Sequence, residues 1–151
     1  MPASDYVQGL RDRVGTDFLL LPAVTAVIRD GDRFLLARQR DTQRWSLVGG
    51  GIEPGEQPAD AVRREVREEL GVDATVEGIV GAYGGPPLEA AYPNGDRVGY
   101  VTIAYACSLS SDRFALERAE LIETSWVELA DLDALDRHEW IGQVLQDAAR
   151  S

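Results

Sequence analysis

The stretch that decides the fold runs from Gly49 to Val72 and reads GGGIEPGEQPADAVRREVREELGV. It opens with three consecutive glycines and continues into a predicted helix over Glu56–Leu70. At about 100° per residue, four apolar side chains fall on one stripe of this helix: Ala59, Val62, Val66 and Leu70. We expect this stripe to pack on the core, because a helix in a globular protein buries its apolar side.

The charged residues of this helix are sorted to the two flanks of the stripe. Glu65 and Glu69 are four residues apart and share one flank, with Glu68 beside them toward solvent, whereas Arg63 and Arg67 lie on the other flank. Like charges at this spacing repel by a few tenths of a kcal/mol, so helix stability alone does not account for them. Clustered carboxylate oxygens are the ligands that Mg²⁺ prefers, which indicates a metal site.

A Glu-rich helix face can also be plain solvated surface, and the glycines bear on the choice. We predict an irregular loop over Gly49–Gly55, in which the three glycines from Gly49 to Gly51 let carbonyl groups approach a cation closely and leave amides near a helix start that can bind phosphate. Arg64 precedes Glu68 by four residues and is expected to hold that carboxylate in place. The two features together favour a metal and phosphate site.

The same residues resemble the Nudix box, a motif of diphosphate hydrolases. Every fixed position is present: Gly50, Glu56, Arg64, Glu65, Val66, Glu68, Glu69, Gly71 and Val72. The likeness covers roughly Leu19 to Trp126, and the one departure is Val48, where many members have proline. It implies an α+β fold, in which a mixed β-sheet lies between helices in an α/β/α sandwich, and a single domain over residues 1–151.

The resemblance also implies the chemistry. Nudix enzymes use Mg²⁺ or Mn²⁺ to hydrolyse a diphosphate bond, typically in a nucleoside diphosphate joined to another group. The implied metal ligands are Glu65, Glu68, Glu69 and the backbone carbonyl of Gly50. Arg64 is expected to orient a carboxylate, and we count it with the three glutamates as catalytic. Glu56 is expected to fix the junction of loop and helix, and Gly71 to end the helix with a positive φ.

The catalytic base and the substrate contacts each have alternative assignments. The base is either a glutamate of the box or an acid of the segment Glu117–Glu123, in which we favour Glu120, also as a metal-linked residue. Arg38 and Arg40 end a strand and resemble contacts to substrate phosphates, although arginines at strand ends also occur as plain surface. His138 could contact a base or transfer a proton, with a capping or surface role as the alternative.

The remaining segments predict a mixed sheet flanked by helices, because strands and helices do not alternate strictly. A first helix within residues 1–15 begins at Ser4 or Asp5, and Asp30–Asp32 forms a hairpin turn. The predicted strands are Phe18–Leu21 with Val24–Ile28, Arg33–Ala37, Trp45–Val48, Val72–Val80, Val98–Cys107 and Leu121–Val127. The last helix is predicted over Asp136–Ala149.

The long irregular loop Gly84–Asp96 is the expected lid or pocket wall, since such loops are often functional. Tyr83, Tyr92 and Trp45 could stack on a base or pack structurally. The prolines Pro86–Pro87 stand where relatives that cleave ADP-ribose often have one. The alternatives for function are therefore a pyrophosphatase specific for ADP-ribose or nucleotide sugars, and a non-catalytic domain that senses nucleotides.

Composition limits the class of protein. A chain of 151 residues fits one domain, and a formal net charge of −11 argues against nonspecific binding to nucleic acid or an anionic membrane. One cysteine excludes an intrachain disulfide, and neither a signal peptide nor a spanning apolar stretch is recognisable. We expect a cytoplasmic protein with a nucleotide-type substrate. The oligomeric state is open, with a homodimer among the options.

Overall fold

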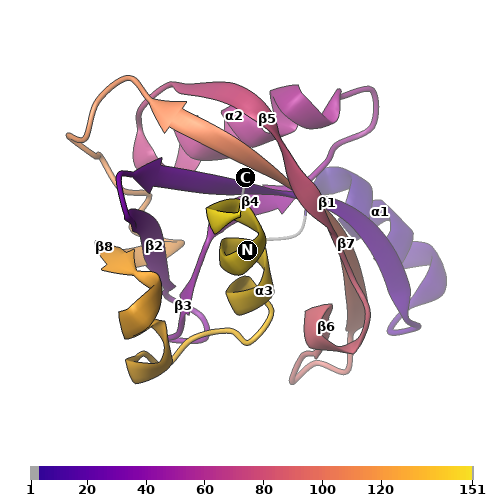
Figure 1. Ribbon diagram of the computed structural model, residues 1–151. Helices are drawn as coiled ribbons and strands as arrows, with labels where there is room; N and C mark the ends of the chain where they lie inside the picture. The colour runs from indigo at the N-terminus through magenta and orange to yellow at the C-terminus, as the bar shows by residue number, and fades with distance from the viewer. Residues whose placement is uncertain (1–3, 151) are drawn as a thin grey trace.

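A computed structural model describes residues 4–150 and shows a curled mixed sheet with helices against it (Figure 1). The strands are β1 (Leu19–Asp30), β2 (Arg33–Gln39), β3 (Trp45–Ser46), β4 (Val48–Gly51), β5 (Ala74–Tyr83), β6 (Glu89–Ala91), β7 (Arg97–Leu109) and β8 (Leu121–Glu128). The helices are α1 (Asp5–Val14), α2 (Pro58–Leu70) and α3 (Ile141–Ala149), with 3-10 helices η1 (Pro86–Leu88) and η2 (Leu129–Ala134). Residues 1–3 and 151, which the predicted first helix and domain include, lie outside the described residues.

The sheet contains both strand directions, as predicted. Its strands follow the order β3-β2-β1-β7-β5, with β4 beside β1, β6 beside β7 and β8 beside β2. β1 and β7 run parallel, from Leu19 opposite Val98 to Ile28 opposite Cys107, and the other pairs are antiparallel. The α+β assignment is therefore confirmed.

Two hydrophobic clusters lie on opposite faces of the sheet. In β2, Leu35 and Ala37 belong to the cluster under α2, whereas Phe34 and Leu36 belong to the cluster under α3. This strict alternation follows from the two-residue period of a strand. The buried stripe of α2 is confirmed, since Val62, Val66 and Leu70 are each fully buried in the first cluster.

Several predicted boundaries are wrong. The glycines expected in an irregular loop form strand β4, and the strand predicted over Trp45–Val48 is split between β3 and β4. α2 begins at Pro58 instead of Glu56, after the N-cap residue Gln57. α3 begins at Ile141 instead of Asp136.

The loop after β5 also differs from its prediction. It is not wholly irregular, because it contains η1 and the strand β6, which pairs with β7. β5 itself is displaced toward the C-terminus and extends to Tyr83.

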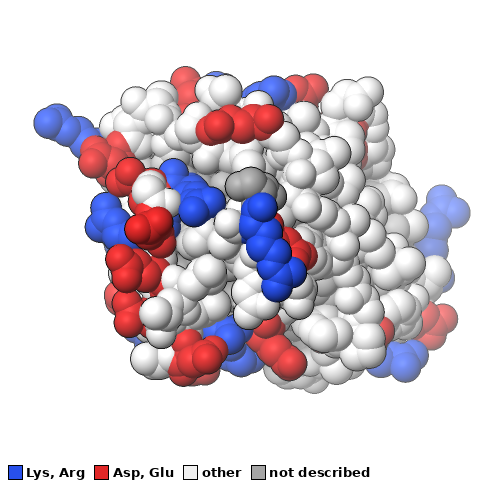
Figure 2. All heavy atoms as spheres, in the orientation of Figure 1, with Lys and Arg blue, Asp and Glu red and all other residues white. Residues whose placement is uncertain are grey.

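The outside of the molecule mixes both signs of charge. Figure 2 shows arginines scattered among acidic side chains on the face that it draws, without a continuous basic patch. Within residues 4–150, no helix has the length and apolar character needed to cross a membrane. α1 lies beside the start of β7, where Arg11 donates a hydrogen bond of 2.8 Å to the carbonyl of Arg97.

Candidate metal and phosphate site

Helix α2 carries two carboxylates that are almost as buried as its apolar stripe. Glu65 is 4% exposed and Glu69 is 8% exposed, whereas Arg63 and Arg67 on the other flank are exposed. The helix ends at Gly71, which has a φ of 70° and donates a hydrogen bond from its amide to the carbonyl of Arg67. Both features confirm that Gly71 ends the helix with a positive φ. Burial of the two glutamates is deeper than the helical pattern alone indicates, because strand β4 covers that flank.

Strand β4 can approach α2 because it has no side chains at the contact. Gly49 donates its amide to Oε2 of Glu69 at 3.2 Å. A methyl group on Gly50 would overlap the Glu65 carboxylate. The glycines therefore lie beside the acidic flank of α2 and not at its N-terminal end, which corrects the expectation that they supply amides near a helix start. Because Gly49 and Gly50 have no side chains, the backbone of β4 lies directly against the carboxylates of Glu69 and Glu65.

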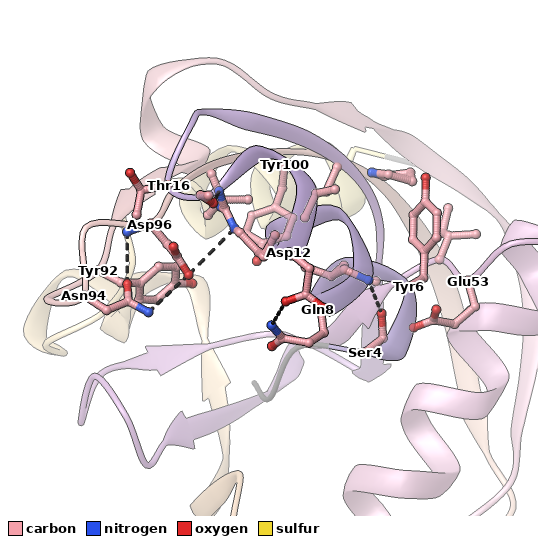
Figure 3. A pocket seen from close by; sticks show the side chains of 18 of the residues that line it. Ser4, Tyr6, Gln8, Asp12, Thr16, Glu53, Tyr92, Asn94, Asp96 and Tyr100 are labelled. Carbon is pink, nitrogen blue, oxygen red and sulfur yellow. Dashed lines mark hydrogen bonds and ion pairs between the residues drawn. The ribbon is translucent and has the colours of Figure 1, made fainter.

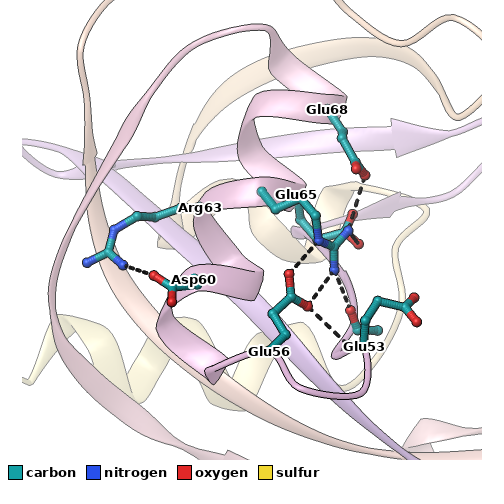
Figure 4. A network of polar contacts seen from close by, with 8 residues as sticks. Glu53, Glu56, Asp60, Arg63, Glu65 and Glu68 are labelled. Carbon is teal, nitrogen blue, oxygen red and sulfur yellow. Dashed lines mark hydrogen bonds and ion pairs between the residues drawn. The ribbon is translucent and has the colours of Figure 1, made fainter.

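Arg64 joins the segment before α2 to the acidic flank, and Figure 4 shows three of its partners, Glu56, Glu65 and Glu68, on the same side of the helix. Its guanidinium donates to both carboxylate oxygens of Glu56, at 2.7 and 3.0 Å, and to the carbonyl of Gly51 at 2.9 Å. It also contacts Glu65 at 2.9 Å and Glu68 at 3.3 Å. The expected contact with Glu68 is present, but the shorter bonds are those to Glu56 and Glu65.

Glu56 completes the junction between loop and helix, as the resemblance implies. Its Oε1 accepts the amide of Glu53 at 3.0 Å while both of its oxygens bind Arg64. The hydrogen bonds from Arg64 lower the pKa of Glu56, so this carboxylate stays ionised. The pair thus fixes the backbone between β4 and α2.

The two buried glutamates of α2 have pKa values well above the usual value for a glutamate. Burial raises the pKa of Glu65 to about 7, although the charge of Arg64 opposes the shift. Burial and the neighbouring charge of Glu65 raise the pKa of Glu69 to about 9, with the Gly49 amide opposing. The charge of Glu120 also raises the pKa of both, and the turn that carries Glu120 is joined to α2 by a hydrogen bond of 3.0 Å from the Glu117 amide to the Glu69 carbonyl. Shifts of this kind cluster at functional sites.

This donor set fits a hard divalent cation. The charges of Glu68 and Glu120 raise the pKa of Glu65, those of Glu65 and Glu120 raise the pKa of Glu69, and Arg64 contacts Glu65 and Glu68. Among residues 4–150, no three acidic, His or Cys side chains already surround one point as a metal cage. Mg²⁺ needs few protein ligands, because water and phosphate complete its shell. The ligand assignment remains a prediction.

A pocket of about 510 Å³ opens beside β4 on the side of α3, and we call it the α3-side pocket. Its wall combines Gly49 and Gly50 with aromatic and polar side chains. These aromatic and polar side chains include Gln39, Thr42, Tyr92, Tyr100, His138 and Trp140. Its size is typical of small-molecule sites, which range from about 300 to 1,000 Å³. Residues from Pro87 to Tyr92 also line it, so the long loop is a pocket wall as predicted.

His138 belongs to this pocket and not to a helix cap. Its Nε2 lies 2.8 Å from Oε1 of Gln39 and 3.3 Å from the hydroxyl of Thr42. Burial and the charge of Arg44 lower its pKa, so the neutral ring is favoured. No spacing pattern in the sequence indicates this contact, since 99 residues separate Gln39 from His138.

Other predicted contacts lie elsewhere. Neither Arg38 nor Arg40 lines the α3-side pocket. The Arg38 Nε donates to the carbonyl of Gln43 at 2.9 Å, and Arg40 donates to the carbonyl of Arg118. Of the three aromatics considered for stacking, Tyr92 lines the pocket. Tyr83 and Trp45 instead pack against the hydrophobic cluster under α3.

The family model for the NUDIX domain matches residues 19–148. The nucleoside triphosphatase NudI of Escherichia fergusonii is 30% identical over 121 residues, which cover 75% of this chain and 85% of that protein. The same enzyme of Enterobacter sp. (strain 638) is 29% identical over 124 residues, 77% and 87% of the two chains. The crystal structure of the MutT protein of Methanosarcina mazei Go1 is 25% identical and has a TM-score of 0.71, with coverage of 89% and 96%.

Proposed function

This chain belongs to the NUDIX family, and we propose that α2 and β4 form the part of it that hydrolyses the diphosphate bond. It is a Nudix hydrolase that acts on nucleotide derivatives. The observation that supports this location is the pair of buried carboxylates of α2, Glu65 and Glu69, which lie against the glycine backbone of β4.

The chain needs a divalent metal, as Nudix hydrolases generally do, and we propose Mg²⁺ or Mn²⁺ at Glu65, Glu68, Glu69, Glu120 and the Gly50 carbonyl. Such an ion, when bound, polarises phosphoryl oxygens and lowers the pKa of coordinated water. The protein positions the carboxylates: Arg64 fixes Glu65 and Glu68, and the Gly49 amide fixes Glu69. Arg64 and Glu56 keep the β4 backbone at a set distance from α2.

We assign the role of proton acceptor to Glu120. It lies on the turn before β8 and not on α2, and it raises the pKa of both buried glutamates. An acid on a separate element can face the attacking water while the helix glutamates hold their partners, which is the geometry that general base catalysis requires. The test is the pH profile of Glu120→Gln, which is expected to lose its acidic limb.

The nucleoside is proposed to occupy the α3-side pocket. Tyr92 and Trp140 offer aromatic surface for a base, and the Gln39–His138 pair offers an amide and a ring nitrogen for its polar edge. The pocket includes Gly49 and Gly50, so a diphosphate attached to this nucleoside reaches the carboxylates of α2.

The decisive experiment compares Glu69→Gln with Asp60→Asn in hydrolysis assays with Mg²⁺ or Mn²⁺. The panel contains nucleoside triphosphates, ADP-ribose, nucleotide sugars and dinucleoside polyphosphates. Both residues are acids of α2, but Asp60 is exposed and pairs with Arg63 outside the cluster. We expect Glu69→Gln to lower kcat by at least about 100-fold, as for loss of a group that stabilises the transition state, and Asp60→Asn to keep wild-type turnover.

Equal turnover by Glu69→Gln and the wild type would place the reaction elsewhere. Tight nucleotide binding without turnover of any substrate would favour the nucleotide-sensing alternative.

A further inference from the structure

A second pocket, of about 540 Å³, opens between α1 and the segment that joins β6 to β7 (Figure 3), and we call it the α1-side pocket. In Figure 3, Glu53 lies at one end of this pocket and Asp96 lies at the other. Glu65 lines the α1-side pocket, whereas Gly50 lines the α3-side pocket. Each pocket therefore borders the contact between α2 and β4.

One wall of the α1-side pocket is held by an arginine that binds the backbone. The side chain of Arg11 is 10% exposed, and its Nε lies 3.7 Å from the Asp96 carboxylate. Its guanidinium also donates to three backbone carbonyls, those of Gly15, Asp17 and Arg97. These contacts join the end of α1 to the start of β7.

Arg137 makes a corresponding set of contacts beside the α3-side pocket. Its side chain is 18% exposed. Its guanidinium donates to three backbone carbonyls, that of Leu132 at 3.3 Å and those of His138 and Glu139 at 3.2 Å each. It also donates to the carboxylate of Asp133 at 3.0 Å, but Asp133 is 95% exposed, and exposed ion pairs contribute little. The bonds to the backbone are therefore the main role of this guanidinium.

The first turn of α3 leaves room for Arg137. Gly142 is the second residue of α3 and is buried, and a methyl group added to it would lie 3.2 Å from Nη1 of Arg137. Glycine in a helix costs about 1 kcal/mol relative to alanine, so helix stability does not account for its presence here. The absence of a side chain at Gly142 lets the start of α3 pack against the guanidinium.

The carbonyls that Arg137 binds belong to the segment that joins η2 to α3, residues 135–140, which we call the η2–α3 segment. Three of its residues line the α3-side pocket, namely His138, Glu139 and Trp140, whereas Arg137 does not line it. The amide of His138 also donates to the carbonyl of Trp45 at 3.0 Å. The segment is thus attached to β3 by its backbone and to η2 through the side chain of Arg137.

From these contacts we propose that Arg137 is a positioning residue for the nucleoside, because it holds the η2–α3 segment in the place where His138 and Trp140 line the α3-side pocket. The inference rests on the proposed function, since it takes the nucleoside to bind in that pocket. A site that is formed in only a fraction of the molecules binds its ligand more weakly by that fraction. Arg137 therefore contributes to substrate affinity and not to the chemical step at α2 and β4.

The first test measures kcat and KM of Arg137→Met with ATP, GTP, CTP and UTP in Mg²⁺. Methionine keeps an apolar side chain but donates no hydrogen bond. We expect KM for the nucleotide with the lowest wild-type KM to rise at least about tenfold, as for a pocket formed in one molecule in ten. kcat should stay within about twofold, because the reacting groups lie on other elements. Inorganic tripolyphosphate, which has no nucleoside, should inhibit both proteins equally.

Two further variants separate position from charge and from stability. Arg137→Lys keeps the positive charge but lacks the planar fork of an arginine, so KM should still rise at least about fivefold. Gly142→Ala keeps every charge but displaces the guanidinium, so KM should rise about two- to threefold while Tm is equal to or above that of the wild type. Wild-type KM values in both variants would overturn the proposal.

Arg11→Met is the matched control, since Arg11 binds three carbonyls and one carboxylate at the other pocket. It should lower Tm, because α1 loses its attachment to β7, but leave KM for the same nucleotide within about twofold. An equal rise in KM for Arg11→Met and Arg137→Met would show that lost stability raises KM. That result would overturn the positioning role.

A last measurement needs no activity. His138 is the one histidine of the sequence, so its ring gives a single C2–H signal in proton NMR. Burial and the charge of Arg44 lower its pKa, whereas Asp41 and Asp136 oppose the shift. In Arg137→Lys, which conserves charge, the pKa should return toward 6.5 as the ring becomes exposed.

The NMR titration separates this inference from the proposed function. An unchanged pKa of His138 in Arg137→Lys would refute the positioning role even if the protein hydrolyses nucleotides. If no nucleotide is hydrolysed, the proposed function fails, and a pKa that returns toward 6.5 still shows that Arg137 holds the η2–α3 segment.

Discussion

Each of the three consecutive glycines of β4 meets a different neighbour. An added methyl at Gly49 would overlap the backbone carbonyl of Val24, and one at Gly50 would overlap the carboxylate of Glu65. At Gly51 the nearest atom is the carbonyl oxygen of Pro22 at 3.9 Å, which is an ordinary contact. The absence of a side chain therefore allows β4 to pair closely with β1 at Gly49, and it leaves room for the Glu65 carboxylate at Gly50.

Alanine substitutions should separate these roles. Gly49→Ala is expected to cost more than about 2 kcal/mol of unfolding free energy, because a backbone atom must move. Gly50→Ala should displace the Glu65 carboxylate, a movable group, and lower kcat about 100-fold with a smaller loss of stability. Gly51→Ala should change stability by less than about 0.5 kcal/mol. Denaturant titrations and hydrolysis assays on the three variants measure both effects; a uniform response would contradict the assignment.

At the scale of residues, the sequence predicts the acidic flank of α2 but not the pocket. Helical spacing suffices to place Glu65 beside Glu69, because both belong to one element. The position of Gln39 in the pocket depends on an irregularity in the pairing of β2 with β8 between Arg38 and Gln39. A bulge re-aims side chains in a way that strand alternation does not predict, and so the sequence contains no signal for Gln39.

Helix α2 and the segment before it are coupled as elements through Arg64. Its side chain is 30% exposed, and it links Glu56, at 17%, to Glu65, at 5%. Arg63 is the adjacent residue and forms an ion pair with Asp60 at 2.9 Å, but the two side chains are 47% and 66% exposed. The two arginines differ in burial and not in charge, which makes them a matched pair.

Arg64→Ala should lower the unfolding free energy by about 1–3 kcal/mol, because partly buried carboxylates lose their partner. It should also lower kcat at least about tenfold, since Glu65 and Glu68 lose their common anchor. Arg63→Ala should cost less than about 1 kcal/mol and leave kcat unchanged, because exposed ion pairs contribute little. Chemical denaturation and initial rates measure both effects in the two variants. Equal effects of the two substitutions would contradict the role of Arg64 as the anchor of Glu65 and Glu68.

At the scale of elements, long periodic segments are predicted and their ends are not. The first helix is capped by Ser4, whose hydroxyl accepts the amide of Val7 at 3.2 Å, as expected. α3 starts later than predicted because the backbone before it pairs with Trp45 instead of forming helical bonds. Trp45 donates to the carbonyl of Asp136 at 2.9 Å and accepts the amide of His138 at 3.0 Å. Such long-range pairing leaves no periodic trace in the sequence.

For the whole molecule, the raised pKa values have a consequence for stability. The pKa values of Glu65 and Glu69 rise from 4.5 to about 7 and about 9 on folding, so the folded state binds protons more tightly than the unfolded chain. The resulting stabilisation is complete below the unfolded pKa and is lost as pH rises through the two folded pKa values. In EDTA, the unfolding free energy should therefore fall between about pH 5 and pH 9 by more than about 1 kcal/mol.

Glu69→Gln should reduce this pH dependence, because an amide does not ionise. Saturating Mn²⁺ at pH 9 should raise the unfolding free energy of the wild type but have a smaller effect on the variant. Urea titrations at several pH values measure each quantity. A flat pH profile for the metal-free wild type would contradict the burial of two ionisable carboxylates.

The layers of the molecule follow from its sequence, but its pockets do not. Alternation in β1 and β2 and the stripe of α2 suffice to predict helices on both faces of a mixed sheet. Each pocket instead is lined by residues from distant segments, such as Gly50, Tyr100 and Trp140 in one, or Asp12 and Glu53 in the other. No local sequence pattern predicts that these distant residues line one pocket, because their positions depend on the curl of the sheet and on the packing of α1 against β7.

The central claim is that a divalent cation binds between the acidic flank of α2 and the backbone of β4. A crystal of the wild type soaked in Mn²⁺ and measured at the manganese absorption edge tests it most directly. We predict an anomalous peak within coordination distance, about 2.0–2.3 Å, of carboxylate oxygens of Glu65 and Glu69 and next to the Gly50 carbonyl, and no peak there in Glu69→Gln. A fully occupied peak elsewhere, with none at these residues in an active crystal, would contradict the account.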